Sequence, residues 1–262
     1  MGNVPAKVNA GYINGWWSMK FPVRYAHLAL WRPALRVLCY HRVHPQASDR
    51  FSVTPEQFDL HLRYLTGSGF SFIRARDLLV DSPLPERPLL LTFDDGYVDN
   101  LQFAQSILQR HRALATIFIV SGYAGDRARW VAGGSTLMSP QELRELDPDV
   151  IELALHSDSH RAFASLSLDD IENDLRRNLE FFSLNNLSMT PVLAYPYGSR
   201  PRCSPDQLQA VFTRLGIRLA FRIGNRVNRV PIANPYEIQR IDVRGDASEA
   251  ALKWKLWVGK LL

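Results

Sequence analysis

The feature that most constrains the fold is a repeated alternation of short apolar runs with stretches of helical period. Seven runs have the length and content of buried strands, and they cover residues 35–41, 88–93, 115–120, 150–155, 192–195, 218–222 and 237–243. Between them, apolar residues recur at helical spacing, as at Phe58, Leu62 and Leu65. Strands that alternate with helices form parallel βα units, and seven or eight such units tend to close into a barrel. We therefore predict an α/β barrel of parallel strands.

The predicted helices begin with clear capping signals. Thr54, Ser139 and Ser204 each precede a proline, a pattern typical of an N-cap followed by the first helical turn. Helices are expected at 99–110, 139–146, 167–184, 204–215 and 250–262, besides one that starts at 54. With 262 residues, 46% of them apolar, the chain is long enough for one large domain with a sizeable core. We predict an aromatic and basic arm over 1–34, the barrel over 35–245 and a basic C-terminal helix over 246–262.

Ionisable and special polar residues gather where the predicted strands end. Five of the seven strands carry them, namely His41, Asp94 with Asp95, His156 with His160, Tyr195 to Gly198, and Arg240 with Asp242. In a barrel of parallel strands these ends share one face, where active sites form. A purely structural protein would gain nothing from this gathering, because buried ionisable groups without partners are costly.

The types of these residues indicate a metal site. Asp94 and Asp95 can face one site only if the strand ends or bulges there, which Gly96 permits. His156 and His160 can converge in a loop after a strand. Two imidazoles and one carboxylate leave open positions for water and substrate, which suits Zn²⁺ or another divalent transition ion. The alternatives are a turn or N-cap role for the aspartates and an unrelated histidine pair.

At this point the motifs resemble those of the polysaccharide deacetylase family, the NodB-like carbohydrate esterases of family 4. Residues 92–96 read Thr-Phe-Asp-Asp-Gly, 156–160 read His-Ser-Asp-Ser-His, 194–198 read Ala-Tyr-Pro-Tyr-Gly, and 115–120 match a further family strand. The resemblance runs from about residue 35 to 245. It implies a distorted (β/α)7-type barrel in a single domain.

The resemblance also implies site roles. Asp95, His156 and His160 would bind one divalent ion, with Zn²⁺ favoured over Co²⁺, Ni²⁺ or Mn²⁺. Asp94 would be the general base, and the backbone N–H of Tyr197 would stabilise the oxyanion. The implied enzyme is a hydrolase that uses metal-activated water to remove N-acetyl groups from an N-acetylglucosamine-containing polysaccharide or lipid-linked saccharide.

Two departures from the family pattern affect the rest of the site. The arginine that many members carry before the Pro-Tyr-Gly segment is replaced by Ala194, so Arg240 is the candidate to support the base; its alternative is an exposed salt bridge. No histidine follows His160, so the general acid is expected to be His41, because the first and last strands of a closed barrel are neighbours. This arrangement resembles the poly-N-acetylglucosamine deacetylase branch, whose motifs appear circularly shifted. A structural role for His41 and a catalytic His44 are the alternatives.

The sequence indicates the residues that contact the substrate less strongly than it indicates the metal site. Tyr197, Trp130 and Asp242 are candidates, with Asp242 also able to orient His41. Trp130 would stack on a sugar ring, or belong to the core or rim. An O-deacetylase and an inactive glycan-binding relative are the alternative functions. A glycosidase would need two carboxylates and no metal, which leaves the histidines without a role.

Charge and hydropathy bear on partners and location. The net charge is +5, but no nucleic-acid-binding motif is found, so we expect a glycan or glycolipid substrate and no nucleic acid. No signal-peptide core or membrane-spanning run is seen, which favours a cytoplasmic protein, at most bound to the inner face of the membrane. Trp254 and Trp257 beside lysines predict either a packed terminal helix or a peripheral membrane contact. Cys39 is expected to be a buried small residue.

Overall fold

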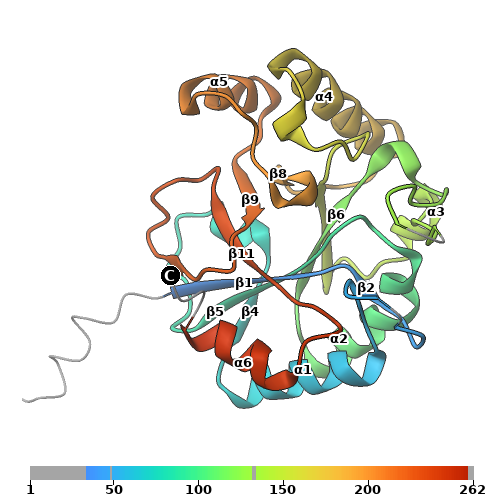
Figure 1. The fold of residues 1–262 in the computed structure, drawn as a ribbon, viewed down its shortest axis with the longest axis vertical. Helices are drawn as coiled ribbons and strands as arrows, with labels where there is room; N and C mark the ends of the chain where they lie inside the picture. The colour runs from blue at the N-terminus through green and yellow to red at the C-terminus, as the bar shows by residue number, and fades with distance from the viewer. Residues whose placement is uncertain (1–33, 48, 132–133, 259–262) are drawn as a thin grey trace, which may run out of the picture. The chain divides into compact units, whose positions relative to one another are not determined.

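The core of the fold is a closed barrel of seven parallel strands. A computed structural model of the chain describes residues 34–47, 49–131 and 134–258. The barrel strands are β1 (Ala34–Tyr40), β5 (Pro88–Phe93), β6 (Ala115–Ile119), β7 (Ile151–Leu155), β8 (Val192–Ala194), β9 (Leu219–Ile223) and β11 (Ile238–Asp242). They pair in this order, and β11 returns to β1 to close the ring (Figure 1). The predicted barrel is confirmed, with each predicted strand present to within two residues.

Two short strands that the sequence did not indicate distort the ring. β4 (Ser71–Ile73) pairs with the first half of β5, whereas β6 pairs with its second half. In the same way, β10 (Asn228–Arg229) lies antiparallel to the start of β1, and β11 meets β1 only at Leu38 and Cys39. The seven-strand ring is therefore closed toward the carboxyl ends of the strands. A separate two-stranded sheet joins β2 (Arg42–Val43) to β3 (Ser52–Val53).

Helices surround the barrel. They are α1 (Pro55–Gly67), α2 (Gln105–His111), α3 (Pro140–Arg144), α4 (Leu168–Leu184), α5 (Pro205–Leu215) and α6 (Glu249–Val258). Thr54, Ser139 and Ser204 form capping boxes with a proline in the first turn, as predicted. The predicted helix at 99–110 instead starts as a π-helical turn, η2 (Asn100–Ala104), where the Asn100 side chain donates to the carbonyl oxygen of His41. Single 3₁₀ turns are η1 (Ala75–Leu78), η3 (Ser121–Tyr123), η4 (Phe163–Ser165) and η5 (Pro196–Gly198).

The barrel interior explains which side chains reach the site. One buried cluster takes residues from all seven strands, including Leu35 and Val37 of β1, Leu90 of β5 and Ile238 of β11. Alternate residues of a strand face the same side. Further along the same strands, Cys39, Thr92 and Arg240 therefore point inward, above this apolar layer. All three are fully buried.

Of the two terminal segments predicted from the sequence, the structure describes mainly the C-terminal one. The predicted arm over 1–34 lies almost wholly outside the described residues, so the predicted division into three parts stays a prediction. The C-terminal helix is present as α6, which packs Leu252 and Leu256 into the core. In the described part of the chain, the helices are all too short or too polar to cross a bilayer.

Candidate metal centre and catalytic site

Asp94 and Asp95 reach the same site because the strand stops before them. β5 ends at Phe93, and Asp95 and Gly96 both have left-handed backbone conformations, with φ of 74° and 86°. A positive φ is uncommon for a non-glycine residue and costs energy, so it is a feature of functional loops. A Cβ on Gly96 would come within 2.8 Å of Ile119 Cδ1. Both carboxylates are consequently buried at the top of the barrel.

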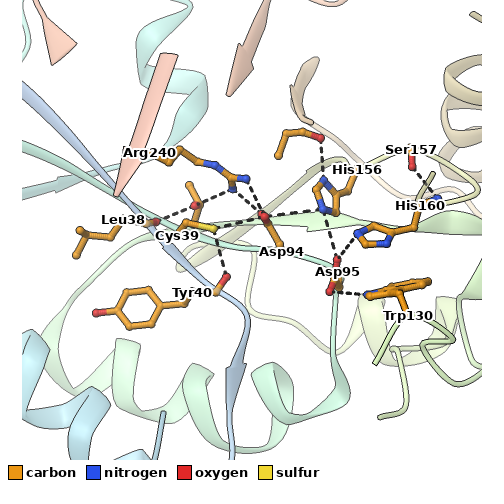
Figure 2. A network of polar contacts seen from close by, with 12 residues as sticks. Leu38, Cys39, Tyr40, Asp94, Asp95, Trp130, His156, Ser157, His160 and Arg240 are labelled. Atoms are coloured by element: carbon orange, nitrogen blue, oxygen red, sulfur yellow. Dashed lines mark hydrogen bonds and ion pairs between the residues drawn. The ribbon is translucent and has the colours of Figure 1, made fainter. Parts of the chain in front are cut away.

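Three side chains converge on one point beside them. Asp95, His156 and His160 each offer a ligand atom, and these atoms lie within 4.8 Å of one another (Figure 2). The Nε2 atoms of His156 and His160 are 3.4 Å and 3.2 Å from Asp95 Oδ1. This oxygen is buried and has no hydrogen-bond partner. A buried carboxylate oxygen without a partner, facing two imidazole nitrogens, is the arrangement expected of a metal site.

The orientation of His156 also fits a ligand role. Its Nδ1 lies 2.8 Å from the carbonyl oxygen of Ala194. Because a carbonyl can only accept, Nδ1 must carry the proton, which leaves the lone pair of Nε2 for a metal. Metal-binding histidines are commonly fixed by such a hydrogen bond on the other ring nitrogen. The residues present therefore fit a divalent ion held by Asp95, His156 and His160.

Trp130 contacts two of the three candidate ligands. Its Nε1 donates to Asp95 Oδ2 at 3.1 Å, and its ring stacks on His160 with centroids 3.9 Å apart. Tyr123 packs edge-on against the same indole. From the sequence, Trp130 was expected either to stack on a sugar ring or to belong to the core or rim. The structure places one face of its indole ring against His160, and this contact was not foreseen.

The 156–160 loop is held by a buried aspartate on α4. Asp174 accepts hydrogen bonds from the backbone N–H groups of Asp158 and Ser159 at 2.8 Å and 3.1 Å. The neighbouring η3 turn must approach this loop closely, because a Cβ on Gly122 would lie 2.6 Å from the Asp158 carbonyl oxygen. Asp174 was not among the candidates from the sequence, where its only signal is a carboxylate between Ile171 and Leu175 in the predicted helix at 167–184.

Asp94 is bound by a fully buried arginine. Arg240 Nη1 and Nη2 donate to Asp94 Oδ1 and Oδ2 at 2.5 Å and 2.7 Å, and the Cys39 thiol donates to Oδ2 at 3.4 Å (Figure 2). Burial raises the pKa of Asp94, but the charges of Arg240 and His156 outweigh it, and the pKa lies at about 2. Asp94 is thus ionised at neutral pH. The alternative of an exposed salt bridge for Arg240 is wrong, because its exposed fraction is 0%.

His41 lies beside this pair, while Asp242 does not contact it. One ring nitrogen of His41 lies within 4.8 Å of an Asp94 carboxylate oxygen and of Cys39 Sγ. Its Nδ1 is buried without a hydrogen-bond partner, and its ring packs on Phe51. Across the described residues, Asp242 shows only backbone hydrogen bonds, its N–H to Asn225 Oδ1 and its carbonyl oxygen from Lys255 Nζ. An orienting contact from Asp242 to His41 is therefore not present.

Tyr197 lies at the rim of the site. It has a left-handed backbone conformation with φ of 56°, and its side chain is 59% exposed. Its ring lies 4.7 Å from that of His160. A Cβ on the next residue, Gly198, would approach Ile223 to within 2.5 Å, so this turn is packed directly against β9.

Sequence comparison identifies the family. The polysaccharide deacetylase family model matches residues 81–220, which is more than half of the chain and includes both aspartates and both histidines of the site. The chain belongs to the polysaccharide deacetylase family. This confirms the family inferred from the motifs and the class of enzyme, a hydrolase. His41 and Arg240 lie outside the matched range, so their assignments depend on the geometry of this polysaccharide deacetylase.

Two named relatives align with this chain over different shares of their length. This polysaccharide deacetylase is 24% identical over 172 residues to YxkH of Bacillus subtilis strain 168, covering 64% of this chain and 58% of YxkH. It is 25% identical over 215 residues to the poly-beta-1,6-N-acetyl-D-glucosamine N-deacetylase of Staphylococcus aureus strain MRSA252, covering 78% of this chain and 71% of the relative. The chain thus spans less than two thirds of YxkH.

Solved structures share the barrel. IcaB from Ammonifex degensii superposes on this polysaccharide deacetylase with a TM-score of 0.71 and 22% identity, covering 86% of this chain and 97% of that one. The Streptococcus pyogenes deacetylase PplD, solved with acetate, gives a TM-score of 0.69 and 20% identity, covering 86% and 99%. At these identities the likeness establishes the fold.

Proposed function

We propose that this polysaccharide deacetylase removes N-acetyl groups from an N-acetylglucosamine-containing glycan. The observation that carries the proposal is the convergence of Asp95, His156 and His160 within 4.8 Å. Asp95 Oδ1 has no hydrogen-bond partner, and an ionised Asp94 lies beside this group. A ligand site and a separate carboxylate are the two parts that hydrolysis of an amide by activated water requires. A glycan-binding relative without activity would not need the buried Asp94–Arg240 pair.

Asp94 is proposed to take the proton from the attacking water. Arg240 donates to both of its oxygens, yet a carboxylate offers about four lone-pair positions, so acceptor capacity remains. The bidentate contact fixes the carboxylate plane, which keeps the accepting lone pair in one direction. The charge of Arg240 also lowers the pKa of Asp94, which lies at about 2 and favours the ionised form needed of a base.

His41 is proposed to protonate the leaving amine. His41 follows β1, whereas His156 and His160 follow β7. Asp94 is close to both groups, with a carboxylate oxygen within 4.8 Å of a His41 ring nitrogen and Oδ2 3.8 Å from His156 Nε2. Base and acid would thus act from neighbouring positions on a substrate held over the site. Within the described residues, no hydrogen bond ties the His41 ring to another protein group, and Nδ1 is buried without a partner, so the proton of the ring is not committed to a protein acceptor.

The remaining groups would stabilise the transition state. A divalent ion held by Asp95, His156 and His160, with Zn²⁺ favoured, would polarise the acetyl carbonyl and lower the pKa of a water molecule. The backbone N–H of Tyr197 is proposed to donate to the developing oxyanion. The exposed Tyr197 ring would contact the sugar.

The substrate class follows from the chemistry and from the named relatives. The S. aureus relative is a poly-beta-1,6-N-acetyl-D-glucosamine N-deacetylase by name. We expect the same type of polymer here, with a lipid-linked saccharide or an O-acetylated sugar as the alternatives. Acetate release should be measured on β-1,6- and β-1,4-linked N-acetylglucosamine oligomers, a lipid-linked N-acetylglucosamine and an O-acetylated oligosaccharide. Acetate together with a new free amine supports the proposal, whereas acetate from the O-acetylated substrate alone contradicts it.

Variants separate the proposed roles. Asp94→Asn should keep the metal and lose activity, while His156→Ala should lose both. His41→Ala should lower turnover by about 10²-fold or more, as expected for a general acid. Loss of metal in Asp94→Asn would exchange the roles of the aspartates. Near-normal turnover in His41→Ala would remove the acid assignment, and His44→Ala would then be the variant to measure.

A peripheral membrane contact is also proposed, through α6. Trp254 and Trp257 are 54% and 47% exposed, three residues apart on one helix. Basic side chains lie against the aromatic rings of this face, with Arg36 and Arg87 over Trp257 and Lys253 over Tyr64. Exposed tryptophan beside cations suits the headgroup region of an anionic bilayer.

A further inference from the structure

A second group of potential metal ligands adjoins the first. Cys39, His41 and Asp94 supply a thiol sulfur, a ring nitrogen and a carboxylate oxygen that all lie within 4.8 Å of one another. Cys39 lies in β1, His41 follows that strand, and Asp94 follows β5. The two strands pair so that Cys39 lies opposite Thr92. The family site does not use Cys39, which is fully buried.

We propose that Cys39, His41 and Asp94 form a second, weaker metal site that binds thiophilic divalent ions and inhibits the enzyme when it is filled. The site follows from the positions of the three side chains. Its inhibitory effect rests on the proposed function, because it would engage both Asp94 and His41. Soft donors such as a thiolate favour Zn²⁺ or Cd²⁺ over hard ions such as Mg²⁺ or Mn²⁺.

The distance between sulfur and oxygen suits this chemistry. Cys39 Sγ lies 3.4 Å from Asp94 Oδ2, as a thiol donating to the carboxylate. In a tetrahedral zinc site, bonds of about 2.3 Å to sulfur and 2.1 Å to oxygen put these atoms about 3.6 Å apart. A metal ion can therefore replace the shared proton with little movement of either side chain. The proton leaves to solvent, and the ion bridges the two atoms in its place.

His41 can complete the site without losing a hydrogen bond. Its Nδ1 is buried and unpaired, and its residue is only half-buried. A tetrahedral site requires its nitrogen to come about 3.3–3.6 Å from the other donors, a shift that a ring rotation can supply. His41 is the least buried of the three residues, so an ion would enter from its side.

Neighbouring charges explain why the site should be weak. Arg240 donates to both oxygens of Asp94, and the Asp95–His156–His160 group lies next to it, with His156 Nε2 3.8 Å from Asp94 Oδ2. A second ion would be repelled by the guanidinium and by an ion in the first site. The thiolate and the carboxylate offset part of this repulsion. The second site should therefore fill only when metal exceeds one equivalent.

The test is a metal titration followed by a signal specific to the thiolate. Metal-free protein is titrated with Cd²⁺, with equilibrium dialysis to count bound ions and ultraviolet absorption to detect sulfur-to-metal charge transfer. Wild type should bind two ions per chain, with the absorption appearing only as the second ion binds. Mn²⁺ should fill one site. A single bound ion, or a second ion without the absorption, would overturn the proposal.

Matched variants test which cysteine gives the absorption. Cys39→Ser should abolish the absorption and the second ion, while Cys203→Ser, which changes the other free cysteine, should behave as wild type. Because Cys39 is in the core, His41→Gln provides a second variant nearer the surface, and it should weaken the second ion by about tenfold or more. Absorption that persists in Cys39→Ser, or is lost in Cys203→Ser, would refute the site.

Activity then tests the inhibitory effect separately. For each protein, acetate release in excess Zn²⁺ is divided by its own maximum. The ratio should fall well below one in wild type and stay near one in Cys39→Ser. Two bound ions and a thiolate signal, with no acetate release at any metal loading including one equivalent, would reject the proposed function and leave the second site standing. Normal acetate release with no thiolate signal would reject the second site and leave the proposed function standing.

Discussion

The charged residues of the site form two adjacent groups, and the carboxylates of the two groups differ in their hydrogen bonding. Asp95 Oδ1 has no hydrogen-bond partner and faces two imidazoles, whereas both oxygens of Asp94 accept hydrogen bonds from Arg240. A fully buried guanidinium is costly without a partner, and a buried carboxylate equally so. The pair therefore stabilises the fold mainly by avoiding an isolated charge, and it keeps Asp94 in one orientation.

Substitution of Arg240 tests this dependence. Arg240→Gln leaves Asp94 buried without a cation, so the free energy of unfolding should fall by about 3–5 kcal/mol. The pKa of Asp94 should rise from about 2, which moves the acidic limb of the pH–activity profile to higher pH. Arg240→Lys keeps the charge but loses the bidentate contact, so its free energy of unfolding and its acidic limb should lie between those of wild type and Arg240→Gln. Urea unfolding and pH–rate profiles check both, and an unchanged acidic limb in Arg240→Gln would contradict the support role.

Trp130 provides a second test among single residues. Trp130→Phe keeps the stacking on His160 and loses the hydrogen bond to Asp95, so metal affinity should fall by about tenfold, and further in Trp130→Ala. Competition with a chelator measures this, with Tyr123→Phe as the control. Normal metal affinity in Trp130→Phe combined with a raised KM for the glycan would restore the sugar-stacking role that the sequence predicted.

Among the secondary-structure elements, β1 and α1 are joined by a buried histidine outside the catalytic groups. His61 of α1 is 8% exposed, and its Nδ1 lies 3.2 Å from the hydroxyl of Tyr40 on β1. Burial lowers the pKa of His61 to about 4, although Glu249 at the start of α6 opposes the shift. The neutral ring is thus part of the contact between β1 and α1.

This shift predicts a pH dependence of stability. Between about pH 6.5 and pH 4 the unfolded state binds a proton at His61 that the folded state does not. The contribution of His61 is therefore complete above pH 6.5, and about 3 kcal/mol is lost as the pH falls through this range. His61→Gln should flatten the dependence in denaturant unfolding across that window. If the free energy of unfolding has the same slope against pH in wild type and His61→Gln, the pH dependence does not come from His61.

The elements also show what the sequence can and cannot predict. The seven barrel strands were predictable because parallel strands covered on both faces read as continuous apolar runs. β4 and β10 have three and two residues, too few to show a period. The convergence of Asp95, His156 and His160 beside Asp94 was predictable from motifs. The contacts of Trp130, Asp174 and Cys39 depend on loop paths and strand register, which residue spacing along the chain does not encode.

For the whole molecule, the placement of α6 relates the proposed membrane contact to the site. Arg36, near the start of β1, donates to the carbonyl oxygen of Leu256 in α6, whereas Asp94 accompanies the opposite end of β1 at Tyr40. A bilayer contacted through Trp257 would lie toward the end of the strands away from the site. This arrangement favours a polymer that extends from the surface over a saccharide held at headgroup depth.

Vesicle binding tests this contact. Wild type should sediment with vesicles that contain phosphatidylglycerol more than with pure phosphatidylcholine, and less at high salt. Replacing both Trp254 and Trp257 with alanine should weaken binding by about tenfold or more, since two exposed rings no longer insert. Leu184→Ala, an exposed apolar residue at the end of α4, is the control. Equal binding by the double variant and wild type would exclude α6 as the contact.

The most direct test of the central claim is acetate release by chelator-treated protein as Zn²⁺ is added back. The substrate is an N-acetylglucosamine oligomer, and His156→Ala is measured in parallel. If Asp95, His156 and His160 hold the ion that the reaction needs, the metal-free protein releases no acetate, and the rate rises to its maximum at one equivalent of metal. His156→Ala stays inactive throughout. Full activity in the metal-free protein, or in His156→Ala, would contradict the account.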